Sequence, residues 1–153
     1  MVQTTDQLQQ FPEFTIYVLH NFDESIDLTA TLETVLTIDA RRVGDGIIAI
    51  DNPSGGSEIE YSIYGTIKFD ATKPPGNPPA FSDPSWINIL RDPLNIDDFD
   101  PANYDHDFVR KIPAGKKNYE SFSNKWSFVL VRARVPSGSA TIAIWERAAA
   151  GGI

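Results

Sequence analysis

The last third of the chain holds its most strongly β-forming sequence, Trp126-Ser-Phe-Val-Leu-Val-Arg-Ala-Arg-Val135 followed by Ala140-Thr-Ile-Ala-Ile-Trp-Glu-Arg147. Both runs are dense in the β-branched and aromatic residues that fit a pleated surface. Between them lies Pro136-Ser-Gly-Ser139, a turn cluster whose length suits a hairpin loop. The pattern predicts a closing β-hairpin. Because an isolated hairpin is only marginally stable, further strands must cover its apolar face.

Two earlier runs, residues 26–38 and 58–70, alternate apolar and polar residues with the period of two that is typical of a half-buried antiparallel strand. The first run is longer than a usual strand, so we expect a bend or break near Thr34. In the second, we expect Ile67 and Phe69 to point inward, and Gly65 to mark a bulge or a close backbone approach. Shorter strands are expected at 14–19, 47–50, 86–90 and 108–112.

The fold class follows from the number of these runs and from the turn residues between them. A chain of 153 residues is one domain by length, and its eleven prolines and ten glycines favour short strands over long helices. About eight strands and no helix-period segment predict an all-β protein, a single antiparallel β-sandwich that is jelly-roll-like. We expect an N-terminal extended arm over residues 1–13, the sandwich over residues 14–147, and a C-terminal tail over residues 148–153.

Composition excludes several classes of function. The net charge of −8 argues against a nucleic-acid partner, because phosphate binding requires a basic face. The absence of cysteine rules out disulfides and cysteine-based metal sites. The N-terminus lacks the pattern of a signal peptide, so a complete chain is expected to be made and released in the cytoplasm. No stretch approaches the length of a membrane span, and we expect no membrane insertion.

Catalytic motifs are missing as well. The two histidines, His20 and His106, are far apart, and there is neither a Gly-x-Ser-x-Gly elbow nor a His-Glu-x-x-His pair. Carboxylates could form an acid/base pair for glycoside cleavage, but nothing in the sequence marks out two of them. The sequence therefore predicts that the protein is not an enzyme and that it has no catalytic residues and no bound cofactor.

An acidic segment over residues 92–107 contains no lysine or arginine. Oxygen-rich loops of this kind bind Ca²⁺, and Asn103-Tyr-Asp-His-Asp107 begins like an EF-hand loop. However, Phe108 stands where the glycine of the sharp turn belongs, and Ala114 where the bidentate glutamate belongs. A solvated loop and a calcium site of another type both remain open. The candidate metal ligands are Asp97, Asp98, Asp100, Asp105 and Asp107.

A basic stretch follows directly, with Arg110, Lys111, Lys116, Lys117 and Lys125 interrupted only by Glu120. It is either a solvated face or a surface that pairs with the acidic loop of another copy, in which case charge would set register and partner choice. We assign the aromatics Trp126, Phe128 and Trp145 to the core. Aromatics in the arm and in loops are candidates for an interface, since such residues are enriched there. The full set of candidate interface residues is Phe11, Phe81, Phe99, Tyr104, Lys116, Lys117 and Tyr119.

Three segments, Tyr61-Ser-Ile-Tyr-Gly65, Ile112-Pro-Ala-Gly115 and Phe128-Val-Leu-Val-Arg-Ala-Arg134 before a final strand, resemble small jelly-roll proteins. Similar β-sandwich subunits build virion surfaces, as decoration, head-fibre and tail proteins, and extracellular prokaryotic filaments. The resemblance spans roughly residues 26–147 in strand order and turn type, and it brings no functional residues with it. It implies a structural role.

These observations favour a non-enzymatic structural subunit that assembles with copies of itself. A protein of the virion surface, bound to a capsid or other scaffold protein, is the first hypothesis. The alternative is the subunit of an extracellular filament in which the N-terminal arm binds along a sheet edge of a neighbour by strand addition. A third class, a carbohydrate-binding module, would require loop aromatics such as Trp86 or Tyr104 to stack on sugars.

Overall fold

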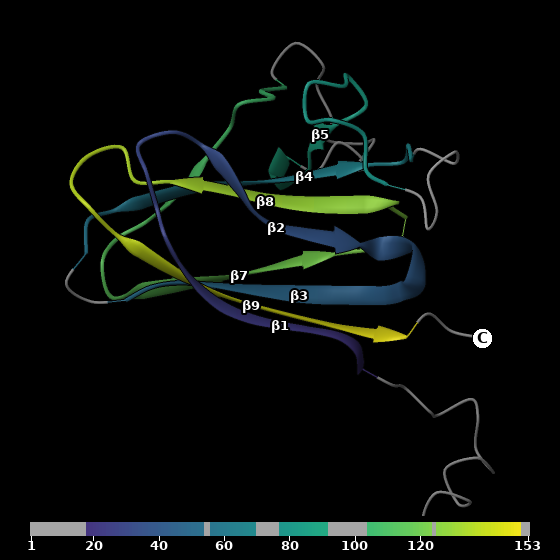
Figure 1. The fold of residues 1–153 in the computed structure, drawn as a ribbon, viewed down its shortest axis with the longest axis horizontal. Helices are drawn as coiled ribbons and strands as arrows, with labels where there is room; N and C mark the ends of the chain where they lie inside the picture. Colours follow the sequence, from purple (N-terminus) through teal and green to yellow (C-terminus); the bar gives the residue numbers. More distant parts are fainter. Residues whose placement is uncertain (1–17, 54–55, 70–76, 92–103, 124, 151–153) are drawn as a thin grey trace, which may run out of the picture.

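The computed structural model describes residues 18–53, 56–69, 77–91, 104–123 and 125–150. Within them the chain forms nine strands and two short 3-10 helices (Figure 1). The strands are β1 (Val18–Asp27), β2 (Glu33–Asp39), β3 (Val43–Asn52), β4 (Ile59–Thr66), β5 (Ile87–Asn88), β6 (Arg110–Ile112), β7 (Lys116–Phe122), β8 (Phe128–Arg134) and β9 (Thr141–Ala150). The 3-10 helices are η2 (Ala40–Arg42) and η3 (Ile89–Arg91).

The strands form two antiparallel sheets that pack face to face, so the predicted all-β sandwich is confirmed. One sheet has the order β1-β9-β3-β7, and the other has the order β2-β8-β4-β5 with β6 also paired to β4. The first strand pairs with the last, the second with the second-to-last, and so on inward. The pairs are β1 with β9, β2 with β8, β3 with β7, and β4 with both β5 and β6. This nested pairing, rolled into two sheets, is the jelly-roll arrangement.

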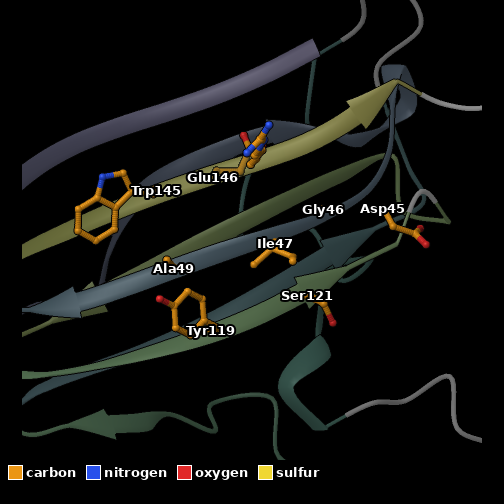
Figure 2. Close-up of a pocket in the computed structure, with 9 residues that line it drawn as sticks. Asp45, Gly46, Ile47, Ala49, Tyr119, Ser121, Trp145 and Glu146 are labelled. Carbon is orange, nitrogen blue, oxygen red and sulfur yellow. The ribbon is translucent and has the colours of Figure 1, made fainter. Parts of the chain in front are cut away.

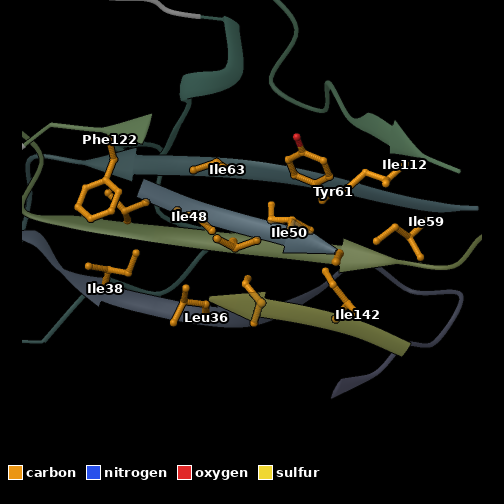
Figure 3. Packing of buried hydrophobic residues seen from close by; sticks show 14 of the residues in the cluster. Leu36, Ile38, Ile48, Ile50, Ile59, Tyr61, Ile63, Ile112, Phe122 and Ile142 are labelled. Atoms are coloured by element: carbon orange, nitrogen blue, oxygen red, sulfur yellow. The ribbon is translucent and has the colours of Figure 1, made fainter. Parts of the chain in front are cut away.

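The main core fills the space between the sheets, because strands of both sheets turn apolar side chains inward (Figure 3). Isoleucines dominate this layer, and Trp126 and Phe122 close it. Each of these aromatic rings lies over a glycine, Trp126 over Gly65 on β4 and Phe122 over Gly46 on β3. A Cβ added at Gly65 would lie 2.5 Å from the Trp126 ring. The prediction at Gly65 was a bulge or a close backbone approach; β4 pairs with β8 without a register shift there, and the group that approaches is the Trp126 side chain.

A second, smaller core lies on the outer face of the five-stranded sheet. It contains Tyr64, Trp86, Phe128 and Leu130, with Phe81 packed against them. The segments over residues 77–91 and 104–109 cover this face, above β4 and β8 in Figure 1. Every residue of β4 is buried, although the alternating sequence predicts that Glu60, Ser62 and Thr66 face solvent. The covering segments contact Ser62 and Thr66, whereas Glu60 lies against Arg134 and Lys111.

The predicted closing hairpin is wrong. β8 pairs with β2 and β4, whereas β9 pairs with β1 and β3, so the two strands belong to different sheets. Residues 136–139 cross from one sheet to the other, beside the connection between β1 and β2. Backbone hydrogen bonds from Val135 to Thr29 and from Leu28 to Ala140 join the two crossings. A four-residue loop serves a hairpin or a crossing, and the sequence pattern of the strands does not distinguish them.

Several strand limits also differ from those expected. The alternating run at 26–38 is divided between β1 and β2, with the break at residues 28–32, while a register shift lies between Thr34 and Leu36. The strand β7 was not expected at all, because its sequence is polar and charged. Ile67 and Phe69 do not point inward as predicted: β4 ends at Thr66, and these side chains are 72% and 44% exposed.

Candidate assembly edges and an exposed aromatic groove

The two sides of the sandwich differ in how their edge strands are protected. On one side β5 and β6 have only two and three residues, and β7 carries Lys116 and Lys117. Short edge strands and lysines are the usual means by which proteins prevent further strand pairing. On the other side β1 has ten residues and β2 seven, and neither contains lysine, arginine or proline. Among the described residues, β1 pairs only with β9 and β2 only with β8.

A connection of five residues, 28–32, joins these two open edges. Side chains that are exposed along them include Ser25 on β1 and Thr37 on β2. Backbone N–H and C=O groups on the outer side of an edge strand are a template for another strand. The β1/β2 side is therefore the part of the described fold that is best suited to strand addition.

The outer face of the four-stranded sheet carries an apolar groove of about 520 Å³ (Figure 2). Three adjacent strands line it, with Ile47 and Ala49 from β3, Tyr119 and Ser121 from β7, and Trp145 and Arg147 from β9. We call it the Trp145 groove. Exposed fractions are 55% for Ile47, 66% for Tyr119 and 36% for Trp145. Large hydrophobic side chains grouped in this way on a surface mark a binding site more often than isolated ones do.

Strand register fixes the shape of the groove. Ala49 lies opposite both Tyr119 on β7 and Trp145 on β9, so the two rings flank its small side chain. With strands about 4.8 Å apart, the backbones that carry the rings are roughly 10 Å apart. The ammonium group of Lys117 lies 6.0 Å from the centre of the Trp145 ring, within the range of a cation–π contact.

The prediction that Trp145 belongs to the core is wrong, because its side chain is exposed. Along β9 the buried side chains are Ile142, Ile144 and Glu146, so Trp145 points to the opposite, outer face. Trp126 and Phe128, which were assigned to the core with it, are buried as expected. The signal in the sequence was the alternation itself: a strand with isoleucines at 142 and 144 turns residue 145 away from them.

The two aromatics proposed for sugar stacking both contact other parts of the chain. Trp86 is 1% exposed, and its indole N–H donates to the Ala80 carbonyl at 3.0 Å. Tyr104 is partly buried, and its hydroxyl accepts a hydrogen bond of 2.6 Å from the Asn88 backbone. Both residues help to fix the segments that cover the five-stranded sheet. Burial therefore rules out sugar stacking on Trp86, while sugar binding at Tyr104 stays a prediction.

The candidate interface residues fall into three groups. Tyr119, Lys116 and Lys117 are exposed on β7, so Tyr119 is a strand residue and not the loop residue that was expected. Phe81 packs within the chain, with the Arg132 guanidinium 3.9 Å from its ring centre. Tyr104 is held as described above. The remaining two, Phe11 and Phe99, lie outside the described residues.

The candidate calcium ligands are only partly placed. Asp97, Asp98 and Asp100 lie outside the described residues, while Asp105 and Asp107 are exposed. Asp105 accepts a hydrogen bond from the backbone N–H of Asp107 at 2.9 Å, which forms a local turn. Within the described ranges, no three His, Cys, Asp or Glu side chains are close enough to hold a metal ion. Calcium binding by the whole acidic segment stays a prediction.

The basic stretch is partly neutralised inside the chain. Both carboxylate oxygens of Glu120 accept hydrogen bonds from Arg110, at 2.8 and 2.7 Å, and Glu120 also accepts one from the Tyr61 hydroxyl. Burial, together with that hydrogen bond to Glu120, raises the pKa of Tyr61 to about 12. These contacts join β4, β6 and β7, so the charges serve the fold at this point. Lys116 and Lys117 remain exposed.

Comparison with known proteins gives little help. No protein-family model matches the chain, and no curated protein matches it. One similar solved structure is described by the words "Bacillus endospore appendages form a novel family of disulfide-linked pili". The two share 7% identity with a TM-score of 0.42, over 90% of this chain and 92% of the other. A likeness at this level says nothing about function, and the present chain has no cysteine for a disulfide.

Among the described residues there is no helix of a length and hydrophobicity that would let it cross a lipid bilayer.

Proposed function

We propose that this protein is a non-enzymatic structural subunit that works by repeated association with copies of itself. The observation that carries the proposal is the β1/β2 side, where edge strands of ten and seven residues lack lysine, arginine and proline, although both carry acidic residues and a register shift near one end. The opposite side is protected more strongly, by two very short strands and by the lysines of β7. An edge left open on one side only suits the addition of one strand from a neighbour.

The incoming strand in this proposal is the N-terminal segment of the next copy, with Phe11 among its contacts. The first described strand begins at Val18, so residues 1–13 precede the sandwich in sequence. A contact between the N-terminal segment of one copy and the edge of the next is heterologous, and such contacts repeat without closing unless the rotation forms a ring.

This geometry favours the subunit of an extracellular filament over a decoration protein of the virion surface. A filament needs only the repeated contact between copies. Attachment to a capsid would require a second surface for the scaffold protein in addition to the contact between copies. The virion surface therefore remains the second candidate setting.

Deletion of residues 1–13 tests the proposal. We expect the full-length protein to form filaments or rings in light scattering and negative-stain images, and the truncated protein to be a folded monomer. If the truncated protein assembles as the full-length protein does, the proposed strand addition is wrong. A full-length protein that stays a 17.0 kDa monomer contradicts self-assembly altogether.

Edge variants test the receiving side. Thr37→Lys places a charge on the β2 edge and Ser25→Lys places one on the β1 edge, and either should block assembly while the monomer stays folded. Ser137→Lys, in the exposed connection between β8 and β9, is the matched control and should assemble normally.

Repeating the assembly measurement with EDTA tests whether calcium takes part. Assembly that is lost in EDTA supports a metal-bridged contact through the acidic segment.

A further inference from the structure

The Trp145 groove is a separate feature from the open edges, and its dimensions are those of a ligand site. A volume of about 520 Å³ lies within the range of roughly 300–1,000 Å³ that is usual for small-molecule sites. Its floor is apolar, with Ile47 and Ala49, and its sides are the rings of Tyr119 and Trp145. The fold does not need these rings for its core, because the main core lies on the other face of the same strands.

Polar groups surround the apolar floor. Ser121 offers a hydroxyl that can donate and accept, and Asp45 has a carboxylate that accepts (Figure 2). Arg147, which also lines the groove, has a guanidinium that donates. Lys117 adds an ammonium group near the Trp145 ring. A ligand that matches this arrangement has flat apolar faces and hydrogen-bonding groups around its edge.

We propose that the Trp145 groove binds a saccharide chain. A pyranose ring presents C–H groups on its faces and hydroxyl groups around its perimeter, which matches aromatic rings bordered by a hydroxyl, a carboxylate and a guanidinium. The electron-rich faces of Trp145 and Tyr119 attract the polarised C–H groups. Because the two rings flank Ala49 two strands apart, more than one sugar unit can lie across them.

Other occupants fit the groove less well. A lipid chain offers no hydrogen-bond acceptor along its length to the Arg147 guanidinium, and a nucleic acid is disfavoured by the net charge of −8. A second copy of the chain would bury the Asp45 carboxylate, and aspartate is depleted in interface cores. The saccharide is therefore the ligand class that the lining residues favour.

Binding can be followed by the fluorescence of Trp145. Trp86 and Trp126 are 1% and 5% exposed, so an aqueous quencher such as acrylamide reaches mainly Trp145. The probes are cellohexaose, chitohexaose and laminarihexaose as neutral chains, and hexagalacturonate as an acidic one. We expect at least one of them to protect Trp145 from quenching and to give a saturable signal in calorimetry. The preferred probe tells whether Arg147 and Lys117 select an acidic sugar.

Three variants make the test specific. Trp145→Ala should lower the affinity for the bound probe by about tenfold or more. Ala49→Leu keeps both rings and fills the space between them, so it should abolish binding while the protein stays folded. Ile67→Ala removes an exposed hydrophobic side chain outside the groove and should leave binding unchanged.

Three results would overturn the proposal: no probe protects Trp145, Ala49→Leu binds as the wild type does, or Trp145→Ala and Ala49→Leu instead lower the mass of the assembled protein. The last result would assign the groove to contacts between copies. Because the 1–13 deletion leaves the groove residues in place, it separates the two proposals: a truncated monomer that binds sugar supports this site whatever becomes of the assembly.

Discussion

The outer face of the five-stranded sheet is covered by other segments of the chain, whereas the outer face of the four-stranded sheet is exposed. On the five-stranded sheet the outward side chains of β4 and β8, such as Tyr64 and Leu130, lie in a second core beneath the segments at 77–91 and 104–109. On the four-stranded sheet the outward side chains Ile47, Tyr119 and Trp145 have no such cover among the described residues. Outward apolar residues therefore lie under a covering segment in the five-stranded sheet, whereas in the four-stranded sheet they form a surface that is available for binding.

The covered face should be the one on which truncation is most damaging. Trp86 is fully buried there, with its ring in the second core and its N–H bonded to Ala80. Trp86→Ala should lower the free energy of unfolding by about 3–5 kcal/mol, the usual effect of removing a buried aromatic side chain. Urea denaturation followed by circular dichroism measures it. A loss below about 1 kcal/mol would mean that the covering segment contributes little to the fold.

This difference between the faces also marks how far the sequence could predict the structure. The alternating pattern of β4 correctly predicts Ile59, Tyr61 and Ile63 in the main core. It wrongly predicts solvent around Glu60, Ser62 and Thr66, because the cover comes from segments far along the chain that leave no trace in the strand itself. Periodicity reports which residues share a face, and only tertiary structure decides what lies on that face.

The Trp145 groove, likewise, could not be predicted from the sequence of any single strand. Tyr119 was predicted as an exposed aromatic and Trp145 as a core residue, yet the register places both beside Ala49 in one groove. No local pattern joins residues 49, 119 and 145, since their strands β3, β7 and β9 become neighbours only when the four-stranded sheet forms. The predicted closing hairpin fails for a related reason: the connection at 136–139 carries no signal that tells a crossing from a turn.

The inner faces of the two sheets, in contrast, should respond alike. Gly65 on β4 and Gly46 on β3 each lie under a buried aromatic ring, and an added Cβ would lie 2.5 and 2.2 Å from the nearest ring atom. Gly65→Ala and Gly46→Ala should each lower the free energy of unfolding by about 1–3 kcal/mol through overpacking. Thermal denaturation of both variants checks this. A loss in one and none in the other would show that the two halves of the core are not equally tight.

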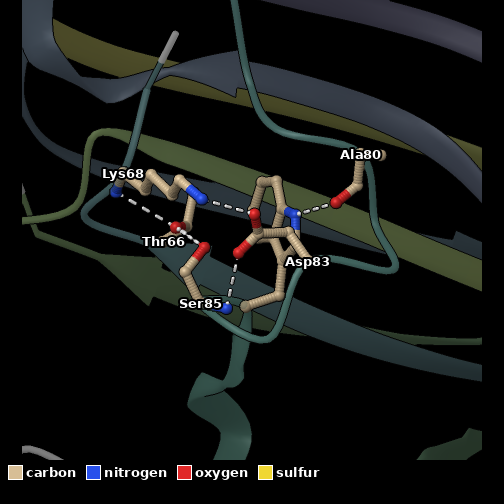
Figure 4. Close-up of polar contacts among 6 residues, drawn as sticks. Thr66, Lys68, Ala80, Asp83 and Ser85 are labelled. Atoms are coloured by element: carbon tan, nitrogen blue, oxygen red, sulfur yellow. Dashed lines mark hydrogen bonds and ion pairs between the residues drawn. The ribbon is translucent and has the colours of Figure 1, made fainter.

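A salt bridge fastens the cover to the end of β4. Lys68 donates to Asp83 at 2.6 Å, and the Ser85 backbone N–H donates to the same carboxylate at 2.9 Å (Figure 4). The hydrogen bond from Lys68, followed by those from Ser85, lowers the pKa of Asp83 to about 2. A carboxyl whose pKa is lowered by folding stabilises the protein above its ordinary pKa, near 4, and this contribution is lost as the pH falls through about 2.

Lys68→Met should therefore raise the pKa of Asp83 while leaving it below its ordinary value, because the hydrogen bonds from Ser85 remain. Titration of the Asp83 carboxyl carbon by NMR between pH 1.5 and 6, a window set by the pKa of about 2, measures the change. The acid-induced loss of stability should begin at a higher pH in the variant. An unchanged pKa would show that Ser85 alone holds the carboxylate and that Lys68 does not fasten the cover.

Trp145→Ala on the uncovered face should have the smallest effect on stability. The ring is more than one third exposed, and the Lys117 ammonium lies 6.0 Å from its centre. Its removal should lower the free energy of unfolding by less than about 1 kcal/mol, in line with exposed cation–π contacts and surface substitutions.

The informative quantity is the difference between the stability losses of Trp145→Ala and Trp86→Ala, measured at several protein concentrations. A tryptophan that stabilises only its own chain gives the same small value throughout, whereas one that is covered by another copy gives a loss that grows with concentration. A concentration-dependent loss would erase the contrast between the two faces, since both would then be covered, one by the chain itself and the other by its neighbour.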